Sequence, residues 1–356
     1  IFSKNNISHL AFELNKPSIV KVKLNSKLRE GFLNLKNSLE EKKFYKLRVG
    51  KLSCDKLYSF EVTVQEGDYQ RIHSITHPCN KSESLKFLFI TDTQSIKTNP
   101  RAGYKRHFGI ARAIEERLFT EEMNFAVHAG DVVSQGGDFD HWLDFFKVAK
   151  MYLNKLPIVA ALGNHDYYGE ENEGNPQNFN KYLRGHSDSK LGNVFLRFPQ
   201  INILVHNTNY EFLNEEQIKE QFRWIKNKCE LSKLMNKKVI LVSHHPAFSS
   251  TFGHLTKDTR YIRKNLLPII EKVGNVPLVL TGHVHTYERS EKDGIVYLNG
   301  GSSGGIFNPS RYKNPYSKFL IRSTATYSTI EVNRVFIKIK TFDQSNELVE
   351  EHKILL

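Results

Sequence analysis

The 356-residue chain is predicted to fold as a large domain of mixed α+β or α/β class, residues 84–356, after a small all-β sandwich, residues 1–83. Three observations predict this. Runs that alternate apolar and polar residues dominate the first region, as in half-buried strands. From residue 86, apolar strands alternate with helical segments, which is typical of βαβ units. Beyond residue 290 the chain returns to strands, which indicates a second sheet packed against the first.

The N-terminal region reads as short strands separated by turn residues. The alternation is clearest at 18–24, 45–49 and 58–64. The one helix-like stretch, 28–39, is weakened by an internal glycine and an asparagine. No cluster of chemistry-bearing residues occurs here, so we interpret the region as a structural or partner-binding module.

The second region gives a regular order of elements. Strands are predicted at 86–91, 125–129, 157–162, 202–206, 238–243 and 277–281, and later at 295–298, 325–332, 335–341 and 348–354. Helices are predicted at 107–120, 139–153, 214–229 and 259–272. The aromatic stripe of the second helix indicates core packing rather than a cofactor site.

Composition limits the classes of partner and compartment. The net charge of +13 favours anionic partners, such as phosphorylated substrates, nucleic acid or acidic surfaces, although lysines spread along the chain also fit a solvated surface. Three cysteines make no disulfide framework and no metal knuckle, and a Cys54–Cys79 pair is left open. No apolar run approaches a membrane span, and the missing leader and initiator Met fit a processed or trimmed chain.

Ligand-type side chains recur where the predicted strands end. The five strand ends carry Asp92, Gly130-Asp131, Gly163-Asn164-His165-Asp166, Ser243-His244-His245-Pro246 and Gly282-His283-Val284-His285. Ligands gather at the carboxyl ends of strands in open α/β sheets, so we expect these side chains to converge. Any one Asp or His is most simply a satisfied loop residue, but five successive strand ends of this type indicate a metal site. The donors suit Fe, Mn or Zn, and their number suits two ions.

These blocks, in this order, resemble those of the calcineurin-like metallophosphoesterases. Residues 282–289 (Gly-His-Val-His-Thr-Tyr-Glu-Arg) are similar to the purple acid phosphatase version of the last block. The N-terminal region, most clearly 48–64, resembles the fibronectin type III-like domain that precedes the catalytic domain in that branch. The resemblance implies a four-layer α/β/β/α metallophosphoesterase sandwich, and it covers 86–305 strongly and the remainder loosely.

The resemblance also implies roles for single residues. Two divalent or trivalent ions would be held by Asp92, Asp131 and His285 at the first site and by Asp131, Asn164, His244 and His283 at the second. His165, next to Asn164, would contact substrate and donate a proton to the leaving oxygen. His254 matches a second substrate histidine of purple acid phosphatases, or is an ordinary loop residue.

Two positions depart from the family pattern. Ser134 stands where the purple enzymes have a tyrosine ligand, so we expect no charge-transfer colour. Gln94 stands where many non-purple relatives have histidine, and its amide oxygen could bind the first metal, directly or through water, more weakly than imidazole. We therefore expect the first site to bind its metal more weakly and to have a different metal preference.

The expected activity is hydrolysis of phosphate monoesters by water that a pair of cations about 3.5–4 Å apart activates. One alternative is a phosphodiesterase or nucleotidase acting on nucleotides or nucleic acid. Another is a non-catalytic binding protein with a degenerate metal site. The loop 97–106 carries four cations that could recognise an anion, or is simply solvated, and 300–305 is read as a flexible turn over the rim of the site. The domain layout predicts a secreted or periplasmic protein.

Overall fold

The computed structural model describes residues 7–18, 20–26, 29–37, 42–51, 57–64, 70–76, 83–95, 100–170, 174–183, 191–309 and 312–356. For residues 7–76, and for 100, 101 and 253, it describes the backbone only. Cys54, Cys79 and Lys97 lie outside the described residues, so the predicted pairing of the two cysteines stays open. Cys229 is a free, buried thiol.

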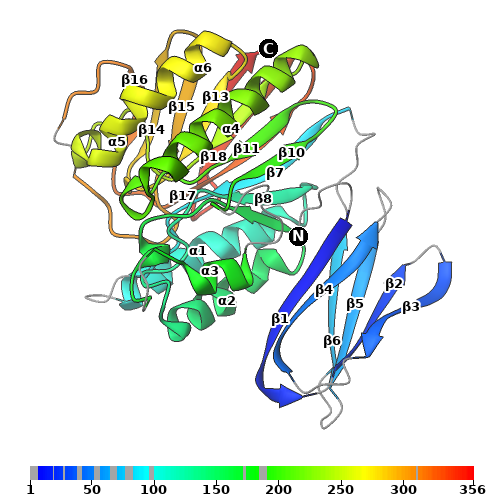
Figure 1. The fold of residues 1–356 in the computed structure, drawn as a ribbon. Helices are drawn as coiled ribbons and strands as arrows, with labels where there is room; N and C mark the ends of the chain where they lie inside the picture. Colours follow the sequence, from blue (N-terminus) through cyan, green and yellow to red (C-terminus); the bar gives the residue numbers. More distant parts are fainter. Residues whose placement is uncertain are drawn as a thin grey trace.

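Two β-sheets form the centre of the larger part of the chain (Figure 1). The six-stranded sheet runs in the order β19 (Leu348–Leu355), β18 (Phe336–Asp343), β17 (Thr326–Val332), β7 (Leu85–Ile90), β8 (Phe125–His128) and β9 (Ile158–Ala160). The seven-stranded sheet runs β10 (Val194–Arg197), β11 (Asn202–Val205), β12 (Val239–Val242), β13 (Leu278–Thr281), β15 (Ile295–Gly300), β14 (Tyr287–Lys292) and β16 (Ser317–Ile321). Parallel pairing joins β7, β8 and β9 in the first sheet, and β11, β12, β13 and β15 in the second.

Helices cover the outer face of each sheet. The six-stranded sheet packs against α1 (Pro100–Arg117), α2 (Phe139–Leu153) and α3 (Gln177–Tyr182). The seven-stranded sheet packs against α4 (Glu215–Leu234), α5 (Lys257–Tyr261), a π-helical turn (Ile262–Leu266) and α6 (Leu267–Val273). The mixed α/β two-sheet prediction is therefore confirmed.

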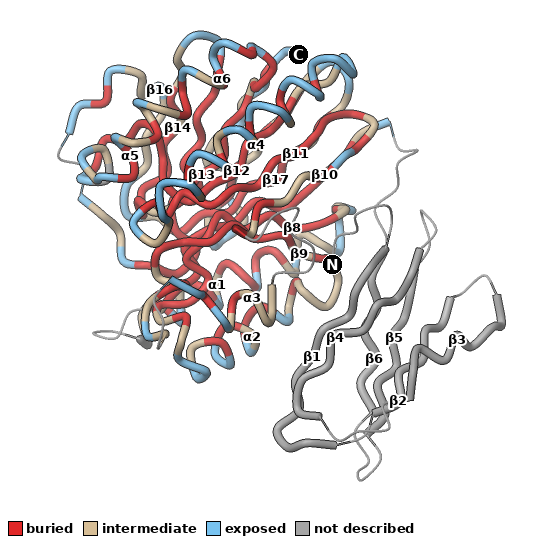
Figure 2. The backbone as a smooth tube through the Cα atoms, viewed as in Figure 1, coloured by how far each residue is buried: buried red, intermediate tan, exposed pale blue. Residues whose placement is uncertain are grey.

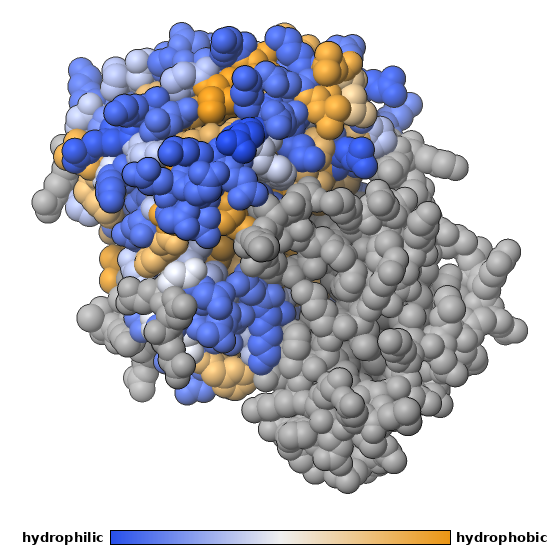
Figure 3. All heavy atoms as spheres, viewed as in Figure 1, coloured by the Kyte–Doolittle hydropathy of each residue, from blue (hydrophilic) through white to orange (hydrophobic). Residues whose placement is uncertain are grey.

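The largest apolar cluster lies between the two sheets, where the strands are buried almost continuously (Figure 2). Phe87, Phe125 and Phe198 stack in it, with ring centroids 5.0 and 5.4 Å apart. Strands buried on both faces read as continuous apolar runs, which is why the sequence marks them clearly. The face in Figure 3 is largely hydrophilic over the outer helices, with scattered hydrophobic patches. No helix among the described residues is long and apolar enough to cross a membrane.

Six strands are described before residue 77. β1 (Ile7–Ser18) pairs with β4 (Lys42–Lys51), and β3 (Arg29–Asn37), β2 (Val20–Ser26), β5 (Leu57–Val64) and β6 (Gln70–Thr76) form an antiparallel sheet. The weak helix-like stretch at 28–39 is thus mostly strand. The likeness of this region to a fibronectin type III-like domain stays a prediction.

Several boundaries differ from the prediction. The first helix begins at Pro100 rather than at 107, so Tyr104, Lys105 and Arg106 belong to α1 and not to a loop. The helix predicted at 259–272 is divided by the π-helical turn. The segment 300–305, predicted to be a flexible turn at the rim, is buried and hydrogen-bonded beneath the site. Strands β10, β14 and β16 and helix α3 were not predicted.

Candidate metal centre

The predicted ligands meet at one edge of the two sheets. Asp92, Asp131 and Asn164 follow β7, β8 and β9 of the six-stranded sheet. His244 follows β12, and His283 and His285 follow β13, all in the seven-stranded sheet. Residues spread over nearly two hundred positions are therefore brought together because parallel strands end at a common edge.

The backbone at these strand ends turns sharply. Asp92, Asp131 and His283 have φ of 53°, 55° and 70°, in the left-handed region that non-glycine residues rarely adopt. A Cβ at Gly282 would lie 1.9 Å from Oγ1 of Thr91, and one at Gly163 would lie 2.1 Å from Oδ1 of Asp131. Glycine is therefore required before these ligands so that the strands can approach closely.

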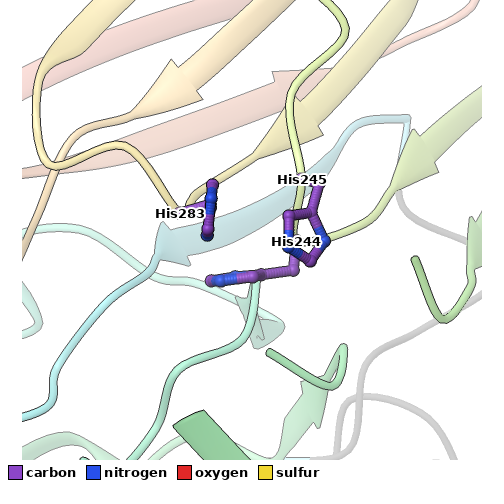
Figure 4. Close-up of side chains that lie close together, drawn as sticks. All are labelled: His244, His245 and His283. Carbon is purple, nitrogen blue, oxygen red and sulfur yellow. The ribbon is translucent and has the colours of Figure 1, made fainter. Parts of the chain in front are cut away.

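The four residues of the predicted second site lie in direct contact. Oδ1 of Asn164 is 3.2 Å from Nε2 of His244 and 3.1 Å from Nδ1 of His283. Nε2 of His244 is also 3.3 Å from Oδ2 of Asp131. The rings of His244 and His283 are 5.1 Å apart, and Figure 4 shows them approaching from two different loops.

The residues of the predicted first site are equally close. Nε2 of His285 is 3.3 Å from Oδ1 of Asp92. Nε2 of Gln94 lies 3.1 Å from Oδ2 of Asp131 and 3.2 Å from Nε2 of His285. Gln94 is almost fully buried, so the structure places it among the predicted ligands rather than on the surface.

This donor set fits a metal ion. Nε2 of His283 and Oε1 of Gln94 are buried and have no hydrogen-bond partner among the described residues, which is costly unless a ligand is bound. Donor atoms of Asp92, Asp131 and His244 all lie within 4.8 Å of one another. Carboxylate and amide oxygens together with imidazole nitrogens suit Fe, Mn or Zn.

Electrostatics couple the carboxylate to the histidines. Burial alone would raise the pKa of Asp131, but His244 and His165 outweigh it, and the pKa lies well below its usual range. Burial likewise opposes protonation of His244, yet Asp131 raises its pKa to about 9. Burial and the neighbouring His244 lower the pKa of His283 to about 3. A cation binding here would therefore compete with a proton on His244.

Asp166 positions the loop that carries Asp131, a role that the sequence analysis did not assign. Its carboxylate is fully buried and accepts hydrogen bonds from the backbone N–H groups of Asp131, Val132, Val133 and Gly163 at 2.9–3.4 Å. The signal was available, because Asp166 lies within the Gly-Asn-His-Asp block.

His245 is a second residue that the sequence analysis left without a role. It is buried, its ring is 4.3 Å from that of His283, and Figure 4 shows it beside the pair. Its Nδ1 is 3.0 Å from Oγ1 of Thr208, and its Nε2 is 3.8 Å from Asp258. Donor atoms of His244, His245 and His283 lie within 4.8 Å of one another, so His245 is a further candidate ligand.

The two predicted substrate histidines differ in position. The backbone N–H of His165 donates to Oδ1 of Asp131 at 2.9 Å, and its Nδ1 lies 3.0 Å from the carbonyl of Ser134. His165 is thus in contact with a ligand. His254 stacks on Tyr312 with centroids 4.0 Å apart, and no contact with a predicted ligand is recorded among the described residues. Its role in substrate binding stays a prediction.

Comparisons with known proteins identify the family of this chain. The profile of the calcineurin-like phosphoesterase family matches residues 85–287. The chain is 23% identical to probable purple acid phosphatase 20 of Arabidopsis thaliana over 204 residues, 52% of this chain and 47% of that protein. It is 26% identical to the probable glycerophosphodiester phosphodiesterase GpdQ of Arcobacter nitrofigilis over 185 residues, 50% of this chain and 63% of that protein. The matches thus span less than two thirds of the length of these relatives.

Solved structures share the fold at low identity. The purple acid phosphatase PPD1 of yellow lupin (Lupinus luteus) gives a TM-score of 0.77 at 12% identity, covering 98% of this chain and 72% of that one. GAP50 of Plasmodium, titled an anchor in the inner membrane complex, gives 0.61 at 19% identity, covering 77% and 90%. The profile match covers more than half of the chain and every strand end that carries a predicted ligand, and the chain therefore belongs to the calcineurin-like phosphoesterase family.

Proposed function

We propose that this protein hydrolyses phosphate monoesters at a centre of two metal ions. The observation that carries the proposal is the contact of Asp131 with donors of both predicted sites, Gln94 on one side and His244 on the other. A carboxylate placed in this way can bridge two cations. The relationship to a probable purple acid phosphatase supports the same activity.

Such a pair of ions, when bound, supplies positive charge for the phosphate and lowers the pKa of water. The protein's own residues orient the ester. Two hydrogen bonds hold His165 in place. Its backbone N–H donates to Asp131, and its Nδ1 contacts the carbonyl oxygen of Ser134. With Nδ1–H donating to that carbonyl, Nε2 is free to face the ester. From the doubly protonated ring, Nε2–H would pass its proton to the leaving oxygen and leave a neutral imidazole.

Hydrolysis of phosphodiesters is the second candidate. A relative of similar identity is a probable glycerophosphodiester phosphodiesterase, and the basic chain also accommodates nucleotides. The same centre would serve both reactions, because both place one phosphorus atom between the metals and the proton donor. The two candidates differ in whether the site accepts a second ester group on the phosphorus.

The deciding experiment measures metal content and hydrolysis together. The protein is loaded with Zn²⁺, Mn²⁺ or Fe and assayed against p-nitrophenyl phosphate and bis(p-nitrophenyl) phosphate from acid to alkaline pH. The proposal expects turnover of the monoester and a loss of at least about a hundredfold in Asp131→Asn. Preference for the diester would favour the second candidate.

A protein that binds no metal and hydrolyses neither compound would instead be a binding protein with a degenerate site. A secreted or periplasmic location and phosphorylated small-molecule substrates stay predictions. Sorting of the full-length protein in its native cell and a wider panel of phosphoesters would test them.

A further inference from the structure

A cavity of about 420 Å³ is lined by residues outside the set of predicted ligands. Its walls include Ser250, Tyr312, Lys313, Asn314 and Arg322. Tyr312, Lys313 and Arg322 are exposed, whereas Ser250 and Asn314 are buried at its base. The cavity therefore combines an accessible cationic rim with a polar floor.

Strand register places one end of the cavity, at Arg322, on the same sheet edge as the metal ligands, while Ser317 lines it from the other end of β16. Ile321 at the end of β16 pairs with Tyr287, and Tyr287 pairs with Gly300 at the end of β15. Because β15 is parallel to β13, Arg322 leaves the sheet at the edge where His283 leaves it. The order β13-β15-β14-β16 separates the two ends by three strand spacings, about 14 Å.

Side chains form a continuous surface between the two places. The Phe252 ring is half exposed and lies 6.3 Å from the ring of His283. His254, in the same short turn, stacks on Tyr312, and the backbone N–H of Tyr312 donates to the carbonyl of Ser250 at 3.0 Å. A ligand held at the metals can thus extend over aromatic rings into the cavity.

The floor of the cavity is fixed by a buried carboxylate. Glu288 accepts hydrogen bonds from the backbone N–H of Ser250 at 2.7 Å, from its hydroxyl at 2.6 Å and from Nδ2 of Asn314 at 2.9 Å. These donors point toward Glu288 and partly neutralise its negative charge. At the rim, neither Lys313 nor Arg322 forms an ion pair with a described residue, so their charge faces the solvent and an incoming ligand.

We propose that this cavity binds a second anionic group carried by an extended phosphoester substrate. The inference rests on the proposed monoesterase activity. In a monoester everything except the phosphoryl group belongs to the leaving group, so the second anion would lie on the leaving group, on the order of 14 Å from the phosphorus. Short neutral esters would be hydrolysed without using the cavity.

Phosphoserine peptides can serve as rulers for this distance. An extended chain rises about 3.3 Å per residue, so the fourth residue from phosphoserine lies about 13 Å away. Two dye-labelled peptides would carry glutamate or glutamine four positions away on both sides of the phosphoserine. We expect kcat/KM and affinity to be about fivefold higher for the glutamate peptide, as for partly exposed ion pairs.

Two sets of variants assign this preference to the cavity. The double variant Lys313→Ala/Arg322→Ala should lose the preference and keep wild-type hydrolysis of p-nitrophenyl phosphate. Arg334→Ala, which removes one cation, is the remote control, because Arg334 follows β17, whose end Val332 pairs with Leu85 at the edge remote from the site. The preference should remain in this control.

Equal treatment of the two peptides by the wild type would overturn the inference, as would a preference that survives in the double variant. Absence of hydrolysis in every metal-loaded protein would overturn the proposed function instead. Fluorescence anisotropy of the labelled peptides would then still decide whether the cavity selects the anion, because binding needs no turnover.

Discussion

Gln94 shows most clearly how one side chain can set the properties of this metal centre. Its Nε2 faces Asp131 and His285, while its Oε1 is buried and has no hydrogen-bond partner in the described part of the chain. Amide oxygen and nitrogen are assigned from the hydrogen-bond network, and a half-turn of the amide would present Oε1 to a cation in the same place. Such a neutral oxygen is a weaker ligand than imidazole for Zn²⁺ or Fe.

We therefore expect Gln94→His to tighten the weaker metal site by on the order of tenfold. Competition with a chromophoric chelator would measure the two zinc dissociation constants. Gln344→His, at an exposed position, is the matched control and should leave both constants unchanged. Two equally tight sites in the wild type would show that Gln94 does not weaken the centre.

Asp166 makes a different contribution, because it fixes the backbone and not the metal. Replacement by Asn puts an N–H₂ donor in place of an oxygen that accepts from two backbone N–H groups. We expect Asp166→Asn to lower the free energy of unfolding by about 2–3 kcal/mol. Urea denaturation would measure this. Asp144→Asn, which alters only an exposed ion pair with Lys147, should change it by less than about 1 kcal/mol.

Among the elements, the segment after β15 departed most from its prediction. A run of glycines and serines suggested a flexible turn, but Ser303, Gly304 and Gly305 donate backbone hydrogen bonds to Thr91 and Asp92. Glycine is used there for space, because a Cβ at Gly304 would lie 2.4 Å from the carbonyl oxygen of Thr93. Composition alone does not separate a flexible glycine from a crowded one.

Gly305 tests that conclusion. A Cβ on Gly305 would lie 2.3 Å from Cε1 of His285, so we expect Gly305→Ala to displace this ring, to cost about 1–3 kcal/mol of stability and to weaken metal binding. Thermal unfolding and zinc titration would measure both effects. In Gly109→Ala the new methyl meets only the end of the Gln344 side chain at 3.1 Å, and its helix should be more stable by up to about 1 kcal/mol. Wild-type zinc affinity in Gly305→Ala would contradict the expectation.

The strands that carry ligands were predictable because they are apolar throughout and end in a polar residue. Strand β14 was missed because Tyr287–Lys292 is mostly polar. Its Glu288 can be buried because Ser250 and Asn314, in two other loops, donate hydrogen bonds to it. The contact of His245 with Thr208 and the support that Asp166 gives to Asp131 also depend on tertiary structure. The sequence thus predicts which residues lie close together. Packing decides which of them bind the metal and which hold those ligands in place.

Across the whole molecule, buried neutral histidines make the fold sensitive to acid. Burial lowers the pKa of His107 and His206 to about 3, against 6.5 when exposed. Between pH 3 and pH 6.5 the unfolded chain binds protons at these histidines more readily than the folded chain does. The contribution of each histidine to the free energy of unfolding is therefore fully present above about pH 6.5 and is lost as the pH falls toward 3. At pH 4.5, each such histidine lowers the free energy of unfolding by about 2–3 kcal/mol relative to neutral pH.

The variant His206→Leu measures this effect, because His206 is buried and burial is the main cause of its low pKa. We expect the wild-type urea midpoint to fall between pH 7 and pH 4.5, and the fall to be smaller in the variant. Equal losses in both proteins would assign the acid sensitivity to other groups. An acidic activity optimum would therefore have to be reached against declining stability.

The donor residues come from both sheets, four following strands of one and three following strands of the other. Only the folded chain assembles all seven, so free metal should raise the thermal midpoint with the logarithm of its concentration, and a chelator should lower it. A free metal concentration of about a hundred times the dissociation constant would raise the free energy of unfolding by about 2.7 kcal/mol. Resistance to heat and proteolysis would then follow the supply of trace elements around the protein, so that scarcity shortens its lifetime before it limits turnover.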